Sequence, residues 1–271
     1  MRRRCSGTKY TLEALEMNDR IVLVGAGNMA TAIACALKER GNAPVAVWSR
    51  TLESAAMLGN RVGCAFTDDL ASLPPADVAI ISVADNALCD VAAAVVRLFP
   101  DILLLHTAGS ISMEALHGAG ATRYGVLYPM QTVNKNSVTS LENVTTFIEG
   151  RDEEVTEQVR RIAALISNKV VYATSEQRCS LHVAAVFACN FPNAVYNMAF
   201  ELMERNGLPF DAMLPLIDEA ARKVHRMSPH EAQTGPARRG DANVMNAHKA
   251  MLDDELANIY ETLSNYIMKR N

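Results

Sequence analysis

Short apolar runs alternate with amphipathic segments along the first two thirds of the chain. The runs have the length of strands and lie at residues 21–24, 45–48, 64–66, 78–83, 102–105, 123–127, 145–148 and 170–172. Between them apolar residues recur at helical spacing, as Ala30, Ile33, Ala34 and Leu37 do. Strands that alternate with helices predict an α/β fold with a doubly wound, mostly parallel sheet of the Rossmann type.

The pattern changes after Thr174, where strand-like runs end and only helical spacing remains. Residues 176–206 form one long helical pattern, and Pro192 in its middle predicts a kink because proline removes a backbone hydrogen bond. More helices are predicted over 209–227 and 244–263. The sequence therefore predicts an N-terminal extension at 1–18, an α/β domain at 19–174 and an all-α domain at 175–271.

Two expectations concern the ends of the chain. Residues 1–16 are basic and have no apolar segment, so they are not a secretory signal, and we expect a flexible tail or an extension from an upstream start codon. The apolar row between Val244 and Leu263 would suit a symmetric contact between two copies, so a homodimer is expected.

Composition narrows the class of protein. The net charge of −4 gives no sign of nucleic acid or an acidic membrane surface as a partner. No apolar run approaches the length of about 18 residues that a membrane helix needs. The six cysteines include no C-x-x-C pair and no ligand-like spacing, which favours reduced thiols, a cytoplasmic location and no metal site.

A glycine-rich turn follows the first predicted strand. Gly25, Gly27 and Ala30 match the pattern G-x-G-x-x-G/A. Gly25 would allow the tight turn, Gly27 would let backbone amides approach a diphosphate, and Ala30 would let helix and strand pack closely. Because the pattern follows a strand and opens a helix, it predicts a dinucleotide site, with a plain tight turn as the alternative.

The end of the second predicted strand lacks the acidic residue that usually holds the ribose of NAD. Ser49, Arg50 and Thr51 stand there instead. A carboxylate would repel a 2′-phosphate, whereas two hydroxyls and a guanidinium can bind one. The sequence therefore predicts NADP as the cofactor, and the alternative is that Arg50 is an ordinary exposed arginine.

Other candidates follow from the rule that ligands bind at the carboxyl ends of the strands. Val83 and Ala84, after the fourth strand, are expected at the cofactor, whereas Asp85 more simply caps the next helix. His106, after the fifth strand, is either a general acid or base or a buried histidine with a backbone partner. Tyr128 follows the sixth strand, within the sequence YPMQT.

Polar residues also mark the helical domain. His182, Asn190, Asn193 and Asn197 lie near one face of the long helical pattern, where they either bond to another helix or contact a ligand. Asn190 is the member for which contact with substrate or nicotinamide is favoured. The loop TGPARRGD holds Arg239 and is either a clamp for a carboxylate or a solvated turn that caps a helix.

The motifs GAGNMA, HTAGSISMEAL, YPMQT, HVAAVFACNFPNA and TGPARRGD together resemble the 6-phosphogluconate-dehydrogenase-like superfamily. Within it, the chain is most similar to a group described as NADP oxidoreductases, with a Rossmann-like domain and a C-terminal domain of unknown function. The resemblance covers nearly all of the chain from Asp19. It implies NADP binding at Gly25, Asn28, Met29, Ser49 and Arg50, and a substrate cleft between the domains.

Two departures limit this resemblance. Hydroxyacid dehydrogenases of the superfamily have a lysine four residues before the helix asparagine, and Val186 stands there in this chain. Pyrroline-5-carboxylate reductase, another relative, has a serine- and glycine-rich helix and a threonine-bearing signature, which VFACNFPN and TGPARRGD replace. We therefore expect hydride transfer from NADPH to a small C=N or C=O substrate, which could carry a carboxylate, with His106 as proton donor and Asn190 and Arg239 as substrate-orienting residues. The competing hypotheses are an NADP-binding sensor or scaffold without catalysis and an imine reductase similar to pyrroline-5-carboxylate reductase.

Overall fold

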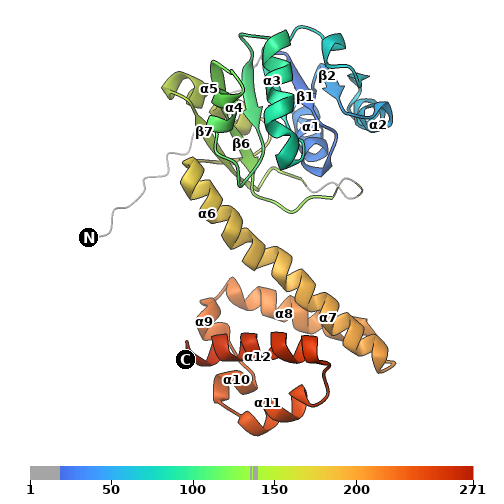
Figure 1. Cartoon of the computed structure of the whole chain (residues 1–271), viewed down its shortest axis with the longest axis vertical. Helices are drawn as coiled ribbons and strands as arrows, with labels where there is room; N and C mark the ends of the chain where they lie inside the picture. The colour runs from blue at the N-terminus through green and yellow to red at the C-terminus, as the bar shows by residue number, and fades with distance from the viewer. Residues whose placement is uncertain (1–18, 135, 137–139, 271) are drawn as a thin grey trace, which may run out of the picture. The chain divides into compact units, whose positions relative to one another are not determined.

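The computed structural model describes residues 19–134, 136 and 140–270, so the expectations for residues 1–18 lie outside the described residues (Figure 1). The chain divides into two compact units, one that ends at Val186 and one that begins at Phe187. The domain boundary that the sequence predicts after Thr174 stays a prediction. No helix within the described ranges is long and apolar enough to cross a membrane.

The first unit is built on one eight-stranded sheet with the strand order β3-β2-β1-β4-β5-β6-β7-β8. Its strands are β1 (Ile21–Val24), β2 (Ala46–Trp48), β3 (Ala65–Thr67), β4 (Val78–Ile81), β5 (Leu103–His106), β6 (Arg123–Pro129), β7 (Thr145–Gly150) and β8 (Lys169–Tyr172). All neighbours pair in parallel except β6 and β7, which are antiparallel. The predicted doubly wound sheet is confirmed.

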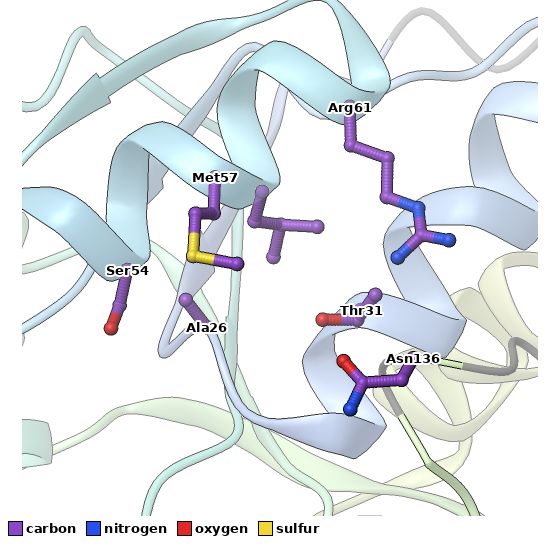
Figure 2. A pocket seen from close by; sticks show the side chains of 7 residues that line it. Ala26, Thr31, Ser54, Met57, Arg61 and Asn136 are labelled. Atoms are coloured by element: carbon purple, nitrogen blue, oxygen red, sulfur yellow. The ribbon is translucent and has the colours of Figure 1, made fainter.

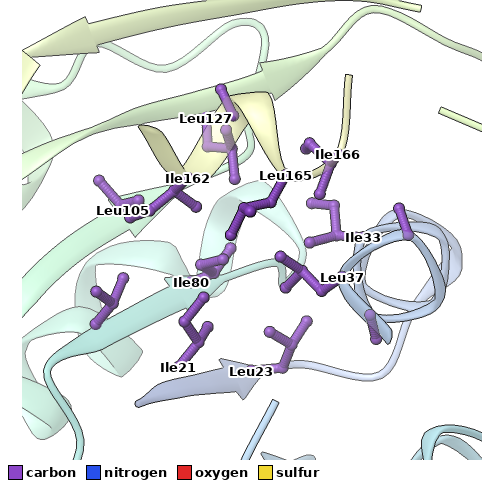
Figure 3. Packing of buried hydrophobic residues seen from close by; sticks show 14 of the residues in the cluster. Ile21, Leu23, Ile33, Leu37, Ile80, Leu105, Leu127, Ile162, Leu165 and Ile166 are labelled. Carbon is purple, nitrogen blue, oxygen red and sulfur yellow. The ribbon is translucent and has the colours of Figure 1, made fainter. Parts of the chain in front are cut away.

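Helices cover both faces of this sheet (Figure 1). One apolar core joins the sheet to α1 (Asn28–Glu39), α2 (Leu52–Val62) and α5 (Glu153–Ala164), and the other joins it to α3 (Leu88–Leu98) and α4 (Glu114–Gly118). In the first core Leu23, Ile80 and Leu105 lie side by side on neighbouring strands, with Ile33 and Ile162 packed from the helices (Figure 3). Burial on both faces is the reason that the strands are uniformly apolar.

A buried ion pair fastens α6 (Ser175–Ala185) to the sheet. The Arg178 guanidinium lies 2.7 Å from Glu149 Oε2, and the two side chains are only 1% and 6% exposed. Glu149, on β7, also accepts hydrogen bonds from the backbone N–H and the hydroxyl of Ser175. Arg178 further donates to the carbonyl oxygens of Ala108 and Ile111, so one cluster joins β7, α6 and the segment after β5.

The second unit is helical, as predicted. After a π-helical turn at Val186–Asn190 come α7 (Phe191–Arg205), α8 (Leu214–Val224), α9 (Pro229–Ala232), α10 (Pro236–Arg239), α11 (Ala242–Lys249) and α12 (Asp254–Met268). Pro192 lies in the first turn of α7, so the interruption expected there takes the form of the π-helical turn before it. Among the unit's described residues, the buried ones are Ala237, Met245 and Ser264.

The ion pair generates a stability prediction. We expect Arg178→Met to lower the free energy of unfolding by about 3–5 kcal/mol, because it leaves the Glu149 carboxylate buried without its partner. The double variant Arg178→Met/Glu149→Leu should lose less than the sum of the single losses. Urea unfolding of the four proteins in this cycle measures the difference.

The matched control is Arg160→Met, since Arg160 pairs with Glu157 at the surface, where both side chains are about half exposed. That change should cost at most about 1 kcal/mol. Equal losses in the two single arginine variants would contradict the importance of the buried pair.

Candidate functional site

The glycine turn after β1 is a crowded crossing point of the sheet. Gly25 has φ +123°, a conformation that side chains other than glycine rarely adopt, and a Cβ on it would lie 2.1 Å from the carbonyl oxygen of Ser82. Its N–H donates to the carbonyl of Trp48, at the end of β2. Glycine is therefore required at this position by the packing of β1 against β2 and β4.

Gly27 is a different kind of glycine. It is the N-cap residue of α1, has an ordinary φ of −77° and is exposed, and a Cβ on it would meet nothing within 4 Å. The protein's own packing therefore does not require glycine here. A helix N-terminus without a side-chain cap and without a Cβ beside it is suited to the close approach of an anion.

A pocket of about 470 Å³ opens over this turn. The sequence-predicted residues that line it are Gly25, Gly27, Asn28, Met29, Ser49, Arg50, Val83 and Ala84. Further lining residues that the prediction did not include are Ala26, Trp48, Ser54, Ser82, Asn86, Ala87 and Val91. Thr51 is not among the lining residues, and its hydroxyl caps α2 by accepting from the Ser54 N–H.

The pocket carries positive charge without a balancing acid. Arg50 is the one ionisable side chain among the described residues that line it, and it is exposed at the end of β2 beside the half-buried Ser49. Asp85, one residue beyond Ala84, does not cap the next helix as predicted. Its carboxylate accepts a hydrogen bond of 2.8 Å from the Ser110 hydroxyl, so this part of the prediction is wrong.

A second, smaller cavity of about 220 Å³ borders the first between α1 and α2 (Figure 2). The two share Ala26 and Ser54. Thr31 from α1, Arg61 from the last turn of α2 and Asn136 from the segment after β6 surround it. No sequence motif marks this cavity, because its lining residues come from separate elements.

His106 ends β5 and is completely buried. Its Nδ1 accepts a hydrogen bond from the Ala108 N–H, which is the backbone partner that the sequence left open as an alternative. Burial, with the nearby charge of Arg178, lowers the pKa of His106 to about 3, so the ring is neutral at pH 7. The Ser112 backbone opposes this lowering of the pKa to a smaller extent than burial favours it, and Nε2 has no hydrogen-bond partner at normal distance among the described residues.

Tyr128 and His182 meet at the neighbouring strand end. Tyr128, near the end of β6, is 8% exposed, and its Oη lies 3.2 Å from Nδ1 of His182 on α6. Sequence analysis named both residues but had no reason to pair them, since 54 positions separate them. Burial raises the pKa of Tyr128, and the Arg178 charge lowers it in part.

The remaining predicted residues lie in the second unit. Asn190 is exposed and ends the π-helical turn, a feature that often marks functional segments. Arg239 is exposed in the short helix α10, and Asp241 caps α11 by accepting from the Val244 N–H, as one reading of the loop expected. Within the described parts of the chain, no group of His, Cys, Asp and Glu side chains could hold a metal ion.

The sheet order and the pocket at its carboxyl edge define a Rossmann-type nucleotide-binding architecture joined to a helical unit. Comparisons with known proteins agree with this class. A family model described as a domain of unknown function (DUF2520) matches residues 144–267, and one described as shikimate / quinate 5-dehydrogenase matches residues 9–99. A comparison with curated proteins gave no match.

Solved structures give the family. A "putative NADP oxidoreductase" from Bacteroides fragilis is 46% identical to this chain with a TM-score of 0.88, and the match covers 93% of this chain and 98% of that one. The chain therefore belongs to the oxidoreductase family of that protein.

Two more distant structures share the fold. A pyrroline-5-carboxylate reductase from Coxiella burnetii is 18% identical, with a TM-score of 0.59 and coverage of 94% of this chain and 97% of that one. An imine reductase from Myxococcus stipitatus in complex with NADP⁺ is 17% identical, with a TM-score of 0.64 and 92% coverage of both chains.

The burial of His106 predicts how stability depends on pH. Because its pKa falls from 6.5 to about 3 on folding, the unfolded chain binds the proton more tightly. The stabilising contribution is complete above pH 6.5 and is lost as the pH falls toward 3, by at most about 1.4 kcal/mol per pH unit. His106→Asn, whose amide oxygen can still accept the Ala108 N–H, should flatten this dependence in urea unfolding from pH 7 to 4.

His117→Asn is the matched control, because His117 is exposed on α4. It should leave the wild-type slope in place. A His106→Asn curve parallel to that of the wild type would contradict the neutral, buried state of His106.

Proposed function

We propose that this protein binds NADPH and transfers its hydride to a small substrate with a C=N or C=O bond. The observation that carries the proposal is the pocket over the glycine turn, in which an arginine is present and no carboxylate is found among the described lining residues. The membership in an oxidoreductase family supports the same reaction class. The nicotinamide supplies the hydride when bound, and the chain supplies binding, orientation and a proton.

Different residues around the pocket are proposed to bind different parts of the cofactor. Backbone amides at the start of α1, from Gly25 to Met29, would hold the diphosphate, because this helix end is uncapped by any side chain. Ser49 and Arg50 would bind the 2′-phosphate, and Val83 and Ala84 would line the remaining wall. Thr51 would act through its cap on α2, which fixes the backbone next to Arg50.

The residues proposed for substrate orientation are Asn190 and Arg239, and His106 is the proton donor that its position at the end of β5 suggests from the sequence. Asn190 and Arg239 are exposed polar groups of the second unit, and Arg239 could pair with a carboxylate on the substrate. His106 is neutral and buried, so it could donate only from a neutral ring. Full turnover by His106→Ala would remove that role.

We also propose that the protein is a homodimer. The second unit leaves large apolar side chains exposed, among them Phe187 at 66%, Leu216 at 67% and Met251 at 80%, while almost none of its described residues is buried. A helical unit with so little core gains stability by covering apolar surface with a second copy. A cytoplasmic location is part of the proposal, supported by the free thiols of the described cysteines.

The first prediction from this proposal concerns cofactor preference. Arg50→Ala should raise the Kd for NADPH about ten- to a hundredfold, since a charged hydrogen bond contributes about 1.5–3 kcal/mol. The Kd for NADH, which has no 2′-phosphate, should stay within about twofold of the wild-type value. Isothermal titration calorimetry with both nucleotides measures the two constants.

Arg97→Ala is the matched control, because Arg97 is exposed in the last turn of α3 and does not line the pocket. It should change neither constant. Tighter binding of NADH than of NADPH by the wild type, or no heat with either nucleotide, would overturn the cofactor proposal.

Turnover separates the enzyme from its alternative. The wild type should consume NADPH with at least one member of a panel of cyclic imines, 2-keto acids and aldehydes. The loss of NADPH absorbance measures this consumption. NADPH binding without consumption across the panel would favour a sensor or scaffold, because a fold does not by itself fix a function.

The dimer gives a separate prediction. Sedimentation equilibrium should yield twice the mass of one chain, and Leu263→Glu, at a half-exposed apolar position of α12, should weaken the association. Leu98→Glu is the control in the first unit, where the side chain is exposed to a similar extent. A monomer at all micromolar concentrations would refute the proposal.

A further inference from the structure

The pair formed by Tyr128 and His182 has the composition of a proton-transfer site. A phenol Oη lies 3.2 Å from an imidazole nitrogen, and the two rings meet edge to face at 64° with centroids 6.3 Å apart. Tyr128 is buried, whereas His182 is half-exposed. The pair therefore joins a shielded hydroxyl to a ring that water can reach.

The chain passes so close to the pair at Gly109 that only glycine fits there. A Cβ on Gly109 would lie 2.6 Å from His182 Nδ1 and 2.9 Å from Tyr128 Oη. The φ of Gly109 is not positive, so its backbone conformation does not require glycine. The absent side chain at this position is explained by the close approach of the two rings.

One hydrogen bond links the nucleotide pocket to the segment that carries Gly109. Ser82 lines the pocket just after β4, and its hydroxyl accepts from the Thr107 hydroxyl at 3.1 Å. Gly109 follows Thr107 by two residues, at the position where an added Cβ would meet both members of the pair. The pocket and the pair thus lie along one carboxyl edge of the sheet, over the ends of β4, β5 and β6, where ligands of such folds bind.

The helix that carries His182 is held rigidly relative to Tyr128. Arg178, one turn before His182, is fixed to Glu149 on β7 and to the carbonyl of Ala108 beside Gly109. The positive charge near the pair is therefore already matched by a buried carboxylate. By contrast His106, on the neighbouring strand, is completely buried, and its Nε2 has no hydrogen-bond partner among the described residues.

We propose that Tyr128 is the proton donor of the reaction and that His182 returns the proton to it from solvent. This inference rests on the proposed function. As a hydride forms the new C–H bond, the π electron pair of C=N or C=O moves to nitrogen or oxygen. That atom takes the proton from Tyr128 Oη, forming N–H or O–H. The phenolate then takes the Nδ1 proton of a His182 imidazolium, which leaves a neutral imidazole, and that ring takes up a proton from solvent.

Steady-state kinetics test the role with NADPH and the cyclic imine 2-methyl-1-pyrroline or the keto acid phenylglyoxylate. Tyr128→Phe should lower kcat about 10²- to 10⁴-fold and leave KM and the Kd for NADPH nearly unchanged. His182→Asn keeps a hydrogen-bonding partner for the phenol but cannot transfer a proton to it. It should lower kcat less and remove one limb of the pH profile of kcat.

Matched variants exclude a general loss of structure. Tyr124→Phe makes the same change on β6 near its other end, where Tyr124 packs against His117, and should leave kcat unchanged. Gly109→Ala should impair turnover, because its methyl group would intrude between the rings, whereas Gly118→Ala adds a methyl group in open space and should not.

A measurement without cofactor tests the pair itself. In the free protein labelled with ¹³C at tyrosine Cζ, the Tyr128 resonance, assigned with Tyr128→Phe, should shift as the His182 ring titrates. The shift should disappear in His182→Asn. A Tyr128 resonance that does not respond to His182 would overturn the coupling.

The outcomes distinguish this inference from the proposed function. Turnover by the wild type with full kcat retained in Tyr128→Phe would overturn the donor role and leave the oxidoreductase in place. NADPH binding without turnover of any substrate in the panel would overturn the proposed function and, with it, the donor role.

Discussion

The buried ion pair between Glu149 and Arg178 is the constraint on which the arrangement of the first unit's ligand-facing edge depends. Two charges removed from water are costly, and they are tolerated only because each is also hydrogen bonded to neighbouring groups. Those bonds reach a strand, a helix and the segment that follows β5. A shift of any of the three would break a hydrogen bond to one of the two buried charges, so the cluster holds α6, and with it His182, in place against β7.

The features that could be predicted from the sequence are local ones. The strands and their order of appearance follow from apolar runs, because a parallel sheet covered on both faces needs little polar alternation. The nucleotide site was also predictable, because its main features lie within one short stretch of sequence. These features are the glycines at Gly25 and Gly27 and the absence of an acidic residue at Ser49 and Arg50. Pro192 predicted an interruption of the long helix but not that it would be a π-helical turn.

The features that could not be predicted join distant parts of the chain. Glu149 and Arg178 are 29 positions apart, and neither stands in a motif that would identify its partner. Asp85 has the position of a helix cap, and only the folded chain brings Ser110 close enough to bond it instead. The sequence placed His106 at a strand end and left burial as one of two alternatives, and only the fold shows the burial and the nearby Arg178 charge that together lower its pKa.

The lack of space for a Cβ at Gly25, beside the Ser82 carbonyl, has a consequence for recognition. At this point β1, β2 and β4 approach so closely that no side chain fits at Gly25. The backbone that forms the floor of the pocket is therefore already in place before a nucleotide binds. A nucleotide that binds there needs to order little of the local backbone. Its binding free energy is therefore reduced little by a loss of conformational entropy in the protein. Under the proposal that NADPH binds in this pocket, its preference over NADH can depend on the single exposed guanidinium of Arg50, because the backbone of the glycine turn does not have to rearrange.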